Sequence, residues 1–290
     1  MPRPRHDPTP RETAAGEPAR LSPRGDMPQP TTAAPVSAAA PVASADPAAS
    51  VSAAHALWQT LAAAGGRTLR DTQLQQLELF LELLARANTT MNLTRLVDLP
   101  RARLLHVADS LTLLPHTPAD ARRLADVGSG GGVPGLVLAV ALPDVQVELI
   151  ESTGKKAAFL RAAAAELGLS NVTVHADRAE AVARTDRREQ FDTVTARAVA
   201  ALPLLLEWCL PLARVGGRVL AMKGPKLAEE LPDARKVVRR LGGGDITVHP
   251  VTAVPGADGH VICCISKVAP TPAPYPRSPQ QARRRPLSEG

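Results

Sequence analysis

The sequence predicts an α/β fold in which a mostly parallel sheet has helices on both faces, contains an antiparallel strand near its C-terminal end and is preceded by a group of helices. Two observations support this prediction. From residue 123 onward, short apolar runs typical of strands alternate with helical patterns, which indicates a parallel sheet. Two late strand patterns are separated by a Pro- and Gly-containing turn at 255–259, so one of them must run antiparallel.

Proline content divides the chain into three parts. The chain has 290 residues and 28 prolines, and most of these lie near the two ends. The first 50 residues include one leucine and no isoleucine or aromatic residue, too little apolar surface to offset the entropy of ordering. We predict a disordered extension at 1–50, a folded domain at 51–269 and a disordered basic tail at 270–290. Within the domain, 51–118 should form the helices and 119–269 the Rossmann-like core.

Leucines at helical spacing predict the helices that precede the sheet. Leu57 and Leu61 indicate a short helix. A clearer helix follows Asp71, a suitable N-cap residue, with leucines at 74, 77, 81 and 84. A third helix should start near Asp98 and end before Pro115, because proline cannot continue a helix.

The remaining pattern predicts the core elements in order. Helices should occupy 155–167, ending at Gly168, as well as 202–212 and 227–241. We expect strands at 123–127, 145–150, 172–175, 191–195, 218–222, 246–251 and 260–267.

Composition excludes several classes of protein. No stretch of 18 or more apolar residues predicts a membrane span, and the N-terminus lacks the apolar run of a secretory signal. Cys209, Cys263 and Cys264 form no CxxC pair and no even set, so we expect buried structural thiols, no metal site and a reducing cytoplasm. The formal net charge of +6 permits a polyanionic partner without requiring one.

A glycine-rich loop carries the strongest functional signal. Asp126, Gly128, Gly130 and Gly132 alternate with other residues where the first strand passes into a helix. This spacing resembles motif I of class I S-adenosylmethionine (SAM) methyltransferases, and an acid at the strand end suits the ammonium group of SAM. Glu151 ends the next strand, where a carboxylate can accept hydrogen bonds from both ribose hydroxyls. A dinucleotide-dependent, NAD(P)-linked oxidoreductase would share these features.

Six blocks in the same order make the resemblance specific. The chain resembles the bacterial small-subunit (16S) ribosomal RNA guanine-N7 methyltransferase family, RsmG/GidB, over about 55–268. The blocks are Asn88–Thr94, His106–Leu111, Asp126–Gly135, Glu151–Leu160, Phe191–Leu202 and Met222–Gly224.

The resemblance implies a role for each matching residue. SAM is the implied cofactor and 16S rRNA, within a small ribosomal subunit or its assembly intermediate, the implied partner of a cytoplasmic, monomeric enzyme. Arg197 ends a strand, where it should point into the ligand crevice, and it joins His106 and Asp109 as a catalytic candidate. The cofactor candidates are Asp126, Gly128, Gly130, Gly132, Val133, Glu151, Ala179, Glu180 and Arg197.

Two further groups of residues complete the prediction. His106 and Asp109 are three residues apart on a predicted helix, so Asp109 could orient the imidazole in a substrate pocket or its lid. Lysines and arginines would grip the RNA phosphates. The RNA-binding candidates are Arg95, Arg123, Lys155, Lys156 and Lys223.

Alternatives to the rRNA guanine-N7 methyltransferase stay open at this point. Another SAM-dependent RNA methyltransferase would have the same loop. A protein that binds RNA without catalysis would have a degenerate loop, yet Asp126, the glycines and Glu151 are all present.

Overall fold

The computed structural model describes residues 47–289 of the chain. Most of the predicted disordered extension, 1–46, lies outside the described residues. Residues 47–50 form the first turn of helix α1 (Pro47–Ala64), so the folded part begins slightly earlier than composition predicts.

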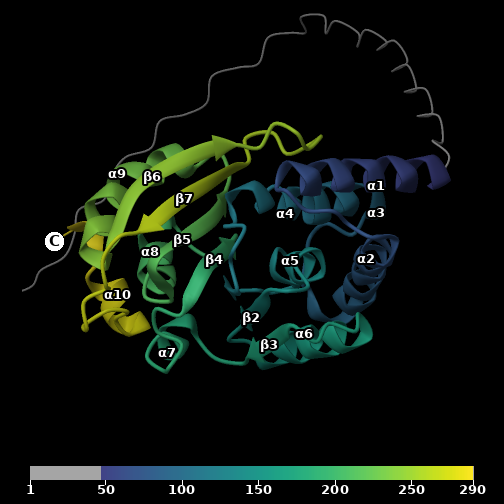
Figure 1. The fold of residues 1–290 in the computed structure, drawn as a ribbon. Helices are drawn as coiled ribbons and strands as arrows, with labels where there is room; N and C mark the ends of the chain where they lie inside the picture. Colours follow the sequence, from purple (N-terminus) through teal and green to yellow (C-terminus); the bar gives the residue numbers. More distant parts are fainter. Residues whose placement is uncertain (1–46, 290) are drawn as a thin grey trace, which may run out of the picture. The chain divides into compact units, whose positions relative to one another are not determined.

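A mostly parallel sheet organises the described part of the chain (Figure 1). Its strand order is β3-β2-β1-β4-β5-β7-β6, and β7 runs antiparallel to both of its neighbours. The fold prediction is therefore confirmed, including the hairpin that ends the sheet. The strands are β1 (Arg123–Val127), β2 (Gln146–Ile150), β3 (Val172–His175), β4 (Phe191–Arg197), β5 (Ala213–Lys223), β6 (Gly243–Pro250) and β7 (Val261–Lys267).

Helices cover both faces of the sheet (Figure 1). Successive side chains of a strand point to opposite faces, and both faces here carry apolar side chains that need to be covered. In β1, Leu124 joins one buried apolar cluster and Ala125 the other. The first cluster packs against α1, α2 (Asp71–Met91), α5 (Gly135–Ala141) and α6 (Gly154–Glu166), and the second against α7 (Ala179–Val182), α8 (Leu202–Cys209) and α9 (Leu227–Val238). No helix in residues 47–289 is long and apolar enough to cross a membrane.

Helix α2 matches the leucine pattern but starts differently from the prediction. Asp71 is its first residue, and Arg70 occupies the N-cap position. The Gln73 side chain accepts a hydrogen bond from the Arg70 backbone N–H at 3.0 Å, which caps the first turn from within. The capping role assigned to Asp71 is therefore wrong.

The third predicted helix is present but is wound unevenly. It runs through α3 (Leu99–Ala102), a π-helical segment η1 (Arg103–Ala108) and α4 (Asp109–Leu111), before a 3₁₀ turn, η2 (Leu114–His116). A π-helix bonds each residue to the fifth along, so its turns hold more residues and side chains face new directions. This change of pitch decides where His106 and Asp109 point.

All three cysteines are free thiols, and burial raises the pKa of each. Cys209 and Cys263 are fully buried, and Cys264 is partly buried on β7. A thiol held in its neutral form is a poor nucleophile. The prediction of structural cysteines is confirmed for Cys209 and Cys263.

The C-terminal segment differs from its predicted disorder. Residues 270–289 include α10 (Pro279–Arg284) and a 3₁₀ turn, η4 (Leu287–Glu289). Thr271 is buried, and Arg277 forms a two-armed ion pair with buried Glu207, with Nε–Oε1 and Nη2–Oε2 distances of 2.7 Å. Few apolar residues are available here, and the polar bonds of Arg277 together with the packing of Tyr275 and Leu287 hold this segment in place.

Breaking the Arg277–Glu207 pair should destabilise the protein. Arg277→Ala leaves the Glu207 carboxylate buried without its partner, which typically costs about 3–5 kcal/mol. Urea denaturation should show this loss. The matched control is Arg239→Ala, because the exposed Arg239–Asp245 pair at 3.7 Å should contribute roughly 0–1 kcal/mol. Equal effects of the two variants would contradict the anchoring role of Arg277.

Candidate functional site

The glycine loop after β1 turns the backbone tightly before α5 begins. Gly128, Gly130 and Gly132 adopt positive φ angles of 71°, 52° and 87°, a conformation that L side chains rarely adopt. A Cβ atom at Gly128 would lie 2.7 Å from a methyl group of Val199. The loop therefore needs glycine for its conformation and for the close approach of the segment after β4.

Asp126 is buried behind this loop and fixes it in place. Its Oδ1 accepts a hydrogen bond from the Thr195 hydroxyl on β4 at 2.9 Å, and its Oδ2 accepts one from the Gly135 N–H at the start of α5 at 3.2 Å. Burial raises the pKa of Asp126 to about 7, against the hydrogen bonds from Thr195 and Ser129. Asp126 does not line the cavity next to the loop, so the geometry gives it a positioning role instead of the predicted contact with the SAM ammonium group.

A cavity of about 490 Å³ opens in front of the loop, at the carboxyl ends of the parallel strands. This is where ligands bind in open α/β sheets. The predicted cofactor residues at the cavity are Gly128, Gly130, Val133, Glu151, Ala179, Glu180 and Arg197, whereas Asp126 and Gly132 are not part of its wall.

Glu151 directly follows β2 and contacts the glycine loop at the cavity wall. It is 6% exposed, and its carboxylate accepts hydrogen bonds from the Gly130 N–H at 2.9 Å and the Thr153 N–H at 2.7 Å. These two bonds hold the carboxylate in one orientation at the wall. A preorganised acceptor of this kind suits a pair of vicinal hydroxyls.

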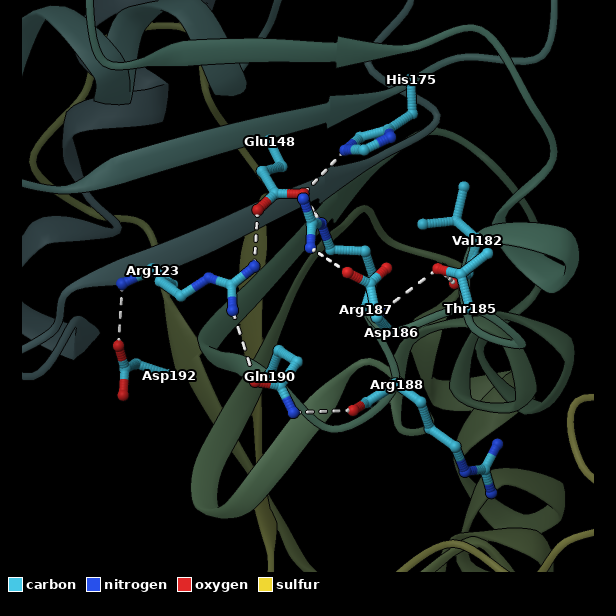
Figure 2. Close-up of polar contacts among 10 residues, drawn as sticks. All are labelled: Arg123, Glu148, His175, Val182, Thr185, Asp186, Arg187, Arg188, Gln190 and Asp192. Carbon is cyan, nitrogen blue, oxygen red and sulfur yellow. Dashed lines mark hydrogen bonds and ion pairs between the residues drawn. The ribbon is translucent and has the colours of Figure 1, made fainter.

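Ala179 and Glu180 begin α7 and form the next part of the wall. The segment that follows them is tied to the sheet by buried Glu148 of β2 (Figure 2). Arg187 and Arg123 bond the Glu148 carboxylate at 2.8 and 2.7 Å. Burial would raise the pKa of Glu148, but hydrogen bonds from His175 and Arg123 outweigh it and lower the pKa to about 2. The charge of Glu148 therefore ties the segment after α7 to the sheet.

Arg197 ends β4 and lines this cavity as well as a second one beside it. Its Nη1 lies 3.4 Å from Oδ2 of Asp109. Burial lowers the pKa of Arg197, while the charges of Asp109 and Asp126 raise it. Arg197 thus lies at the crevice formed by the strand ends, where its position at the end of β4 places it.

His106 and Asp109 do not form the predicted pair. His106 lines the cofactor-side cavity, and its Nε2 lies 3.1 Å from the Thr94 hydroxyl. Asp109 instead contacts Arg197 and His260. The π-helical winding explains the difference, because residues three apart share a face in an α-helix but not in the wider turn of a π-helix. Burial and the nearby Arg197 charge lower the pKa of His106 to about 4, so the imidazole is neutral at pH 7.

The five RNA-binding candidates occupy different places. Lys156 lines the first cavity, Lys155 beside it is exposed, and Arg95 is exposed near Thr94. Lys223 lines the second cavity, where its Nζ pairs with Glu230 at 2.7 Å. Arg123 begins β1, so it lies at the N-terminal ends of the parallel strands, whereas the cavity lies at their carboxyl ends. There it bonds to Glu148 and stacks over Phe191. The structure therefore gives Arg123 a structural role.

Sequence reasoning missed several residues of the site. Thr94 and Trp208 line the first cavity, and His260 lines the second. Trp208 follows β4 on α8, so its nearness to the strand ends was the available signal. His260 precedes β7, and no local pattern relates it to Asp109, 151 residues earlier.

The first cavity fits a nucleoside-containing cofactor. Oε1 of Glu180 and Nε1 of Trp208 are buried at its wall and have no hydrogen-bond partner among the described residues. Glu151 provides a fixed carboxylate, and the glycine loop leaves room for close approach. Within residues 47–289, no group of His, Cys, Asp or Glu could hold a metal ion.

The strand order, the loop after β1 and the acid that ends β2 define a class I SAM-dependent methyltransferase fold. The family model described as GidB, rRNA small subunit methyltransferase G, matches residues 73–254. This chain therefore belongs to the GidB family.

Curated relatives agree with this family over most of their length. The chain is 46% identical over 227 residues to "Ribosomal RNA small subunit methyltransferase G" of Roseiflexus sp. (strain RS-1), covering 78% of this chain and 97% of the relative. Identity to the protein of the same name from Geobacillus thermodenitrificans (strain NG80-2) is 38% over 233 residues, or 79% and 98% of the two chains. A solved O-methyltransferase from Bacillus cereus, in complex with SAH, superposes with a TM-score of 0.48 at 19% identity, covering 65% of this chain and 91% of that chain.

The pKa of Asp126 predicts a specific pH dependence of stability. The pKa of Asp126 is raised from about 4 in the unfolded chain to about 7 in the fold. The stability that the protonated Asp126 contributes is therefore fully present at low pH and is lost as pH rises toward 7. Relative to Asp126→Asn, the wild-type free energy of unfolding should fall by about 2 kcal/mol between pH 5 and 7. Urea denaturation of both proteins across this range measures the difference, and a constant difference would contradict the raised pKa.

Proposed function

We propose that this protein methylates N7 of a guanine in 16S small-subunit rRNA, with SAM as the methyl donor. The observation that carries the proposal is the cavity at the strand ends, which brings the glycine loop, Glu151 and Glu180 together in a chain of the GidB family. The printed name of its relatives, ribosomal RNA small subunit methyltransferase G, supports a small-subunit rRNA substrate. The choice of guanine N7 rests on the family resemblance of the six sequence blocks.

Each wall of the first cavity suits one part of the cofactor. Glu151 would accept hydrogen bonds from the ribose hydroxyls, and the start of α7 at Ala179 and Glu180 would meet the adenine ring. The glycine loop would approach the remaining, amino-acid part. When bound, SAM supplies an electrophilic methyl group on a positively charged sulfur.

The second cavity, of about 470 Å³, would receive the target nucleotide. It shares Arg197 and Ala198 with the first cavity, so the two open side by side at the ends of β4 and β5. Arg197 would hold the guanine by its O6 acceptor and leave N7 free. Lys226 is exposed at this cavity and could contact a phosphate.

The reaction needs no general base, because guanine N7 carries a lone pair and no proton. The lone pair would form the new N–C bond as the methyl group leaves sulfur, and the electrons of the broken C–S bond would stay on sulfur. The base gains the positive charge that sulfur loses. Catalysis therefore depends on positioning. A neutral His106 at the cavity wall is consistent with this, since no proton has to be moved.

We propose that recognition depends on the charge and shape of an assembled or assembling small subunit, met by a monomeric enzyme in the cytoplasm. Single-stranded RNA is commonly bound by stacking its bases on aromatic side chains. Among the described residues, Trp58, Phe80, Phe159 and Phe191 are buried, Trp208 lines the cofactor cavity, and Tyr275 packs against the second apolar cluster beneath Arg277. Base stacking is thus a minor contribution here, and methylation of 30S particles should exceed that of naked 16S rRNA.

Loss of Arg197 should abolish most of the methylation. Arg197→Ala removes the donor shared by both cavities, and we expect roughly a 100-fold lower rate because the base is no longer positioned. Mass mapping of 16S rRNA from cells that carry only this variant measures the product. A normal level of N7-methylguanine in the variant would contradict the role of Arg197 and would point to another hydrogen-bond donor.

Loss of the Glu151 charge should weaken cofactor binding. Hydrogen bonds to a charged acceptor contribute about 1.5–3 kcal/mol, so Glu151→Gln should raise the dissociation constant of SAM roughly 10- to 100-fold. Calorimetry with SAM measures this constant, and titration with NAD tests the oxidoreductase alternative. The control is Glu166→Gln, an exposed change near the end of α6, which should leave binding unchanged. Unchanged binding by Glu151→Gln would exclude a ribose contact.

A further inference from the structure

Asp109 joins three elements that are far apart in the sequence. It begins α4, Arg197 ends β4, and His260 lies just before β7. Oδ2 of Asp109 lies 3.4 Å from Nη1 of Arg197 and 3.2 Å from Nδ1 of His260. Asp109, Arg197 and His260 all line the second cavity, and Arg197 alone of the three also lines the first.

The burial of Asp109 makes these two contacts important. Asp109 is 1% exposed, and an ionised carboxylate so far from water needs partners that donate to it. Its Oδ2 has the two contacts from Arg197 and His260, whereas its Oδ1 has no hydrogen-bond partner among the described residues. The carboxylate therefore depends on these two side chains, and they in turn are held by it.

The contact uses only part of the Arg197 guanidinium. Arginine has five N–H donors in a rigid plane, and Nη1 of Arg197 forms an ion pair with Asp109 without a hydrogen bond among the described residues. The attraction between the two charges restrains the direction of the whole plane. Arg197 lines both cavities, so donors of its guanidinium that Asp109 does not engage are available at the place where the target nucleotide and the cofactor would meet.

We propose that Asp109 and His260 are positioning residues that act through Arg197. They hold its guanidinium in the wall between the two cavities so that its free N–H donors meet the target nucleotide. His260 fixes the Asp109 carboxylate from the β7 side, and Asp109 fixes Arg197. The inference rests on the proposed function, since it assigns the target nucleotide to the second cavity.

A double-mutant cycle tests whether Asp109 and His260 act through Arg197. The single variants Asp109→Asn and His260→Ala should lower kcat about 10- to 100-fold through misplacement of Arg197, with little change in the dissociation constant of SAM. In an Arg197→Gln background, each should lower kcat no further. Additive losses in that background would overturn the proposal, because they would show a role independent of Arg197.

Conservative variants separate positioning from general stability. The side-chain amide of Asn places a donor near the position of the histidine Nδ1, so His260→Asn should restore most of the kcat lost in His260→Ala. The His260 side chain is 32% exposed, so His260→Ala and His260→Asn should both fold. They keep the test valid if Asp109→Asn, which leaves Arg197 buried without a counter-charge, fails to fold. The matched control is His249→Gln, a histidine of β6 that contacts His116 and lies outside both cavities. Wild-type kcat in His260→Ala would overturn the proposal.

A readout besides activity keeps this inference separate from the proposed function. The NMR signal of the Arg197 Nε–H, assigned by its loss in Arg197→Gln, should shift in His260→Ala and return in His260→Asn. Wild-type protein that transfers no methyl group to 30S particles would refute the proposed function. An unshifted Arg197 signal in His260→Ala would refute the positioning role even where methylation is normal.

Discussion

The buried carboxylate of Asp126 is the constraint on which the site depends. Its two oxygens bond to β4 through Thr195 and to the first N–H of α5 through Gly135, so a single side chain joins the two central strands and the helix after the glycine loop. The loop between them has little freedom left, and a side chain at Gly135 would meet Oδ2 of Asp126 at 2.7 Å. The loop is therefore rigid before any ligand arrives, which lowers the cost of binding.

Two other buried carboxylates join distant segments of the fold in a similar way. Glu148 ties the segment after α7 to β1 and β2, and Asp109 ties α4 to the ends of β4 and β7 (Figure 2 shows the Glu148 network). Each carboxylate is nearly free of water and is contacted by arginine or histidine from distant parts of the chain. Asp126 on the cofactor side and Asp109 on the proposed nucleotide side are thus separate anchors, and Arg197 is the charged residue common to the two cavities.

Local pattern and strand direction were enough to bring several of the predicted site residues to one cavity. Gly128, Gly130, Glu151, Ala179, Glu180 and Arg197 follow strand ends, and parallel strands bring those ends to one edge of the sheet. The prediction failed where a contact depended on side-chain direction or on sequence separation. The Asp126 side chain bonds to the start of α5 and does not line the cavity. The π-helical segment turns His106 and Asp109 to different sides, and Arg123 lies at the N-terminal ends of the strands, away from the cavity.

The sequence by itself determined the α/β class, the strand and helix order, the glycine loop and the family, because periodicity and short motifs are local properties of the chain. Only the tertiary structure decided which partner each charged side chain has. A buried charge must find an opposite charge or a donor wherever the fold brings one, and that partner can be 151 residues away, as His260 is from Asp109. Pairing of a buried charge also holds residues 270–289 on the domain, because Arg277 bonds to buried Glu207. Composition alone does not reveal such a contact.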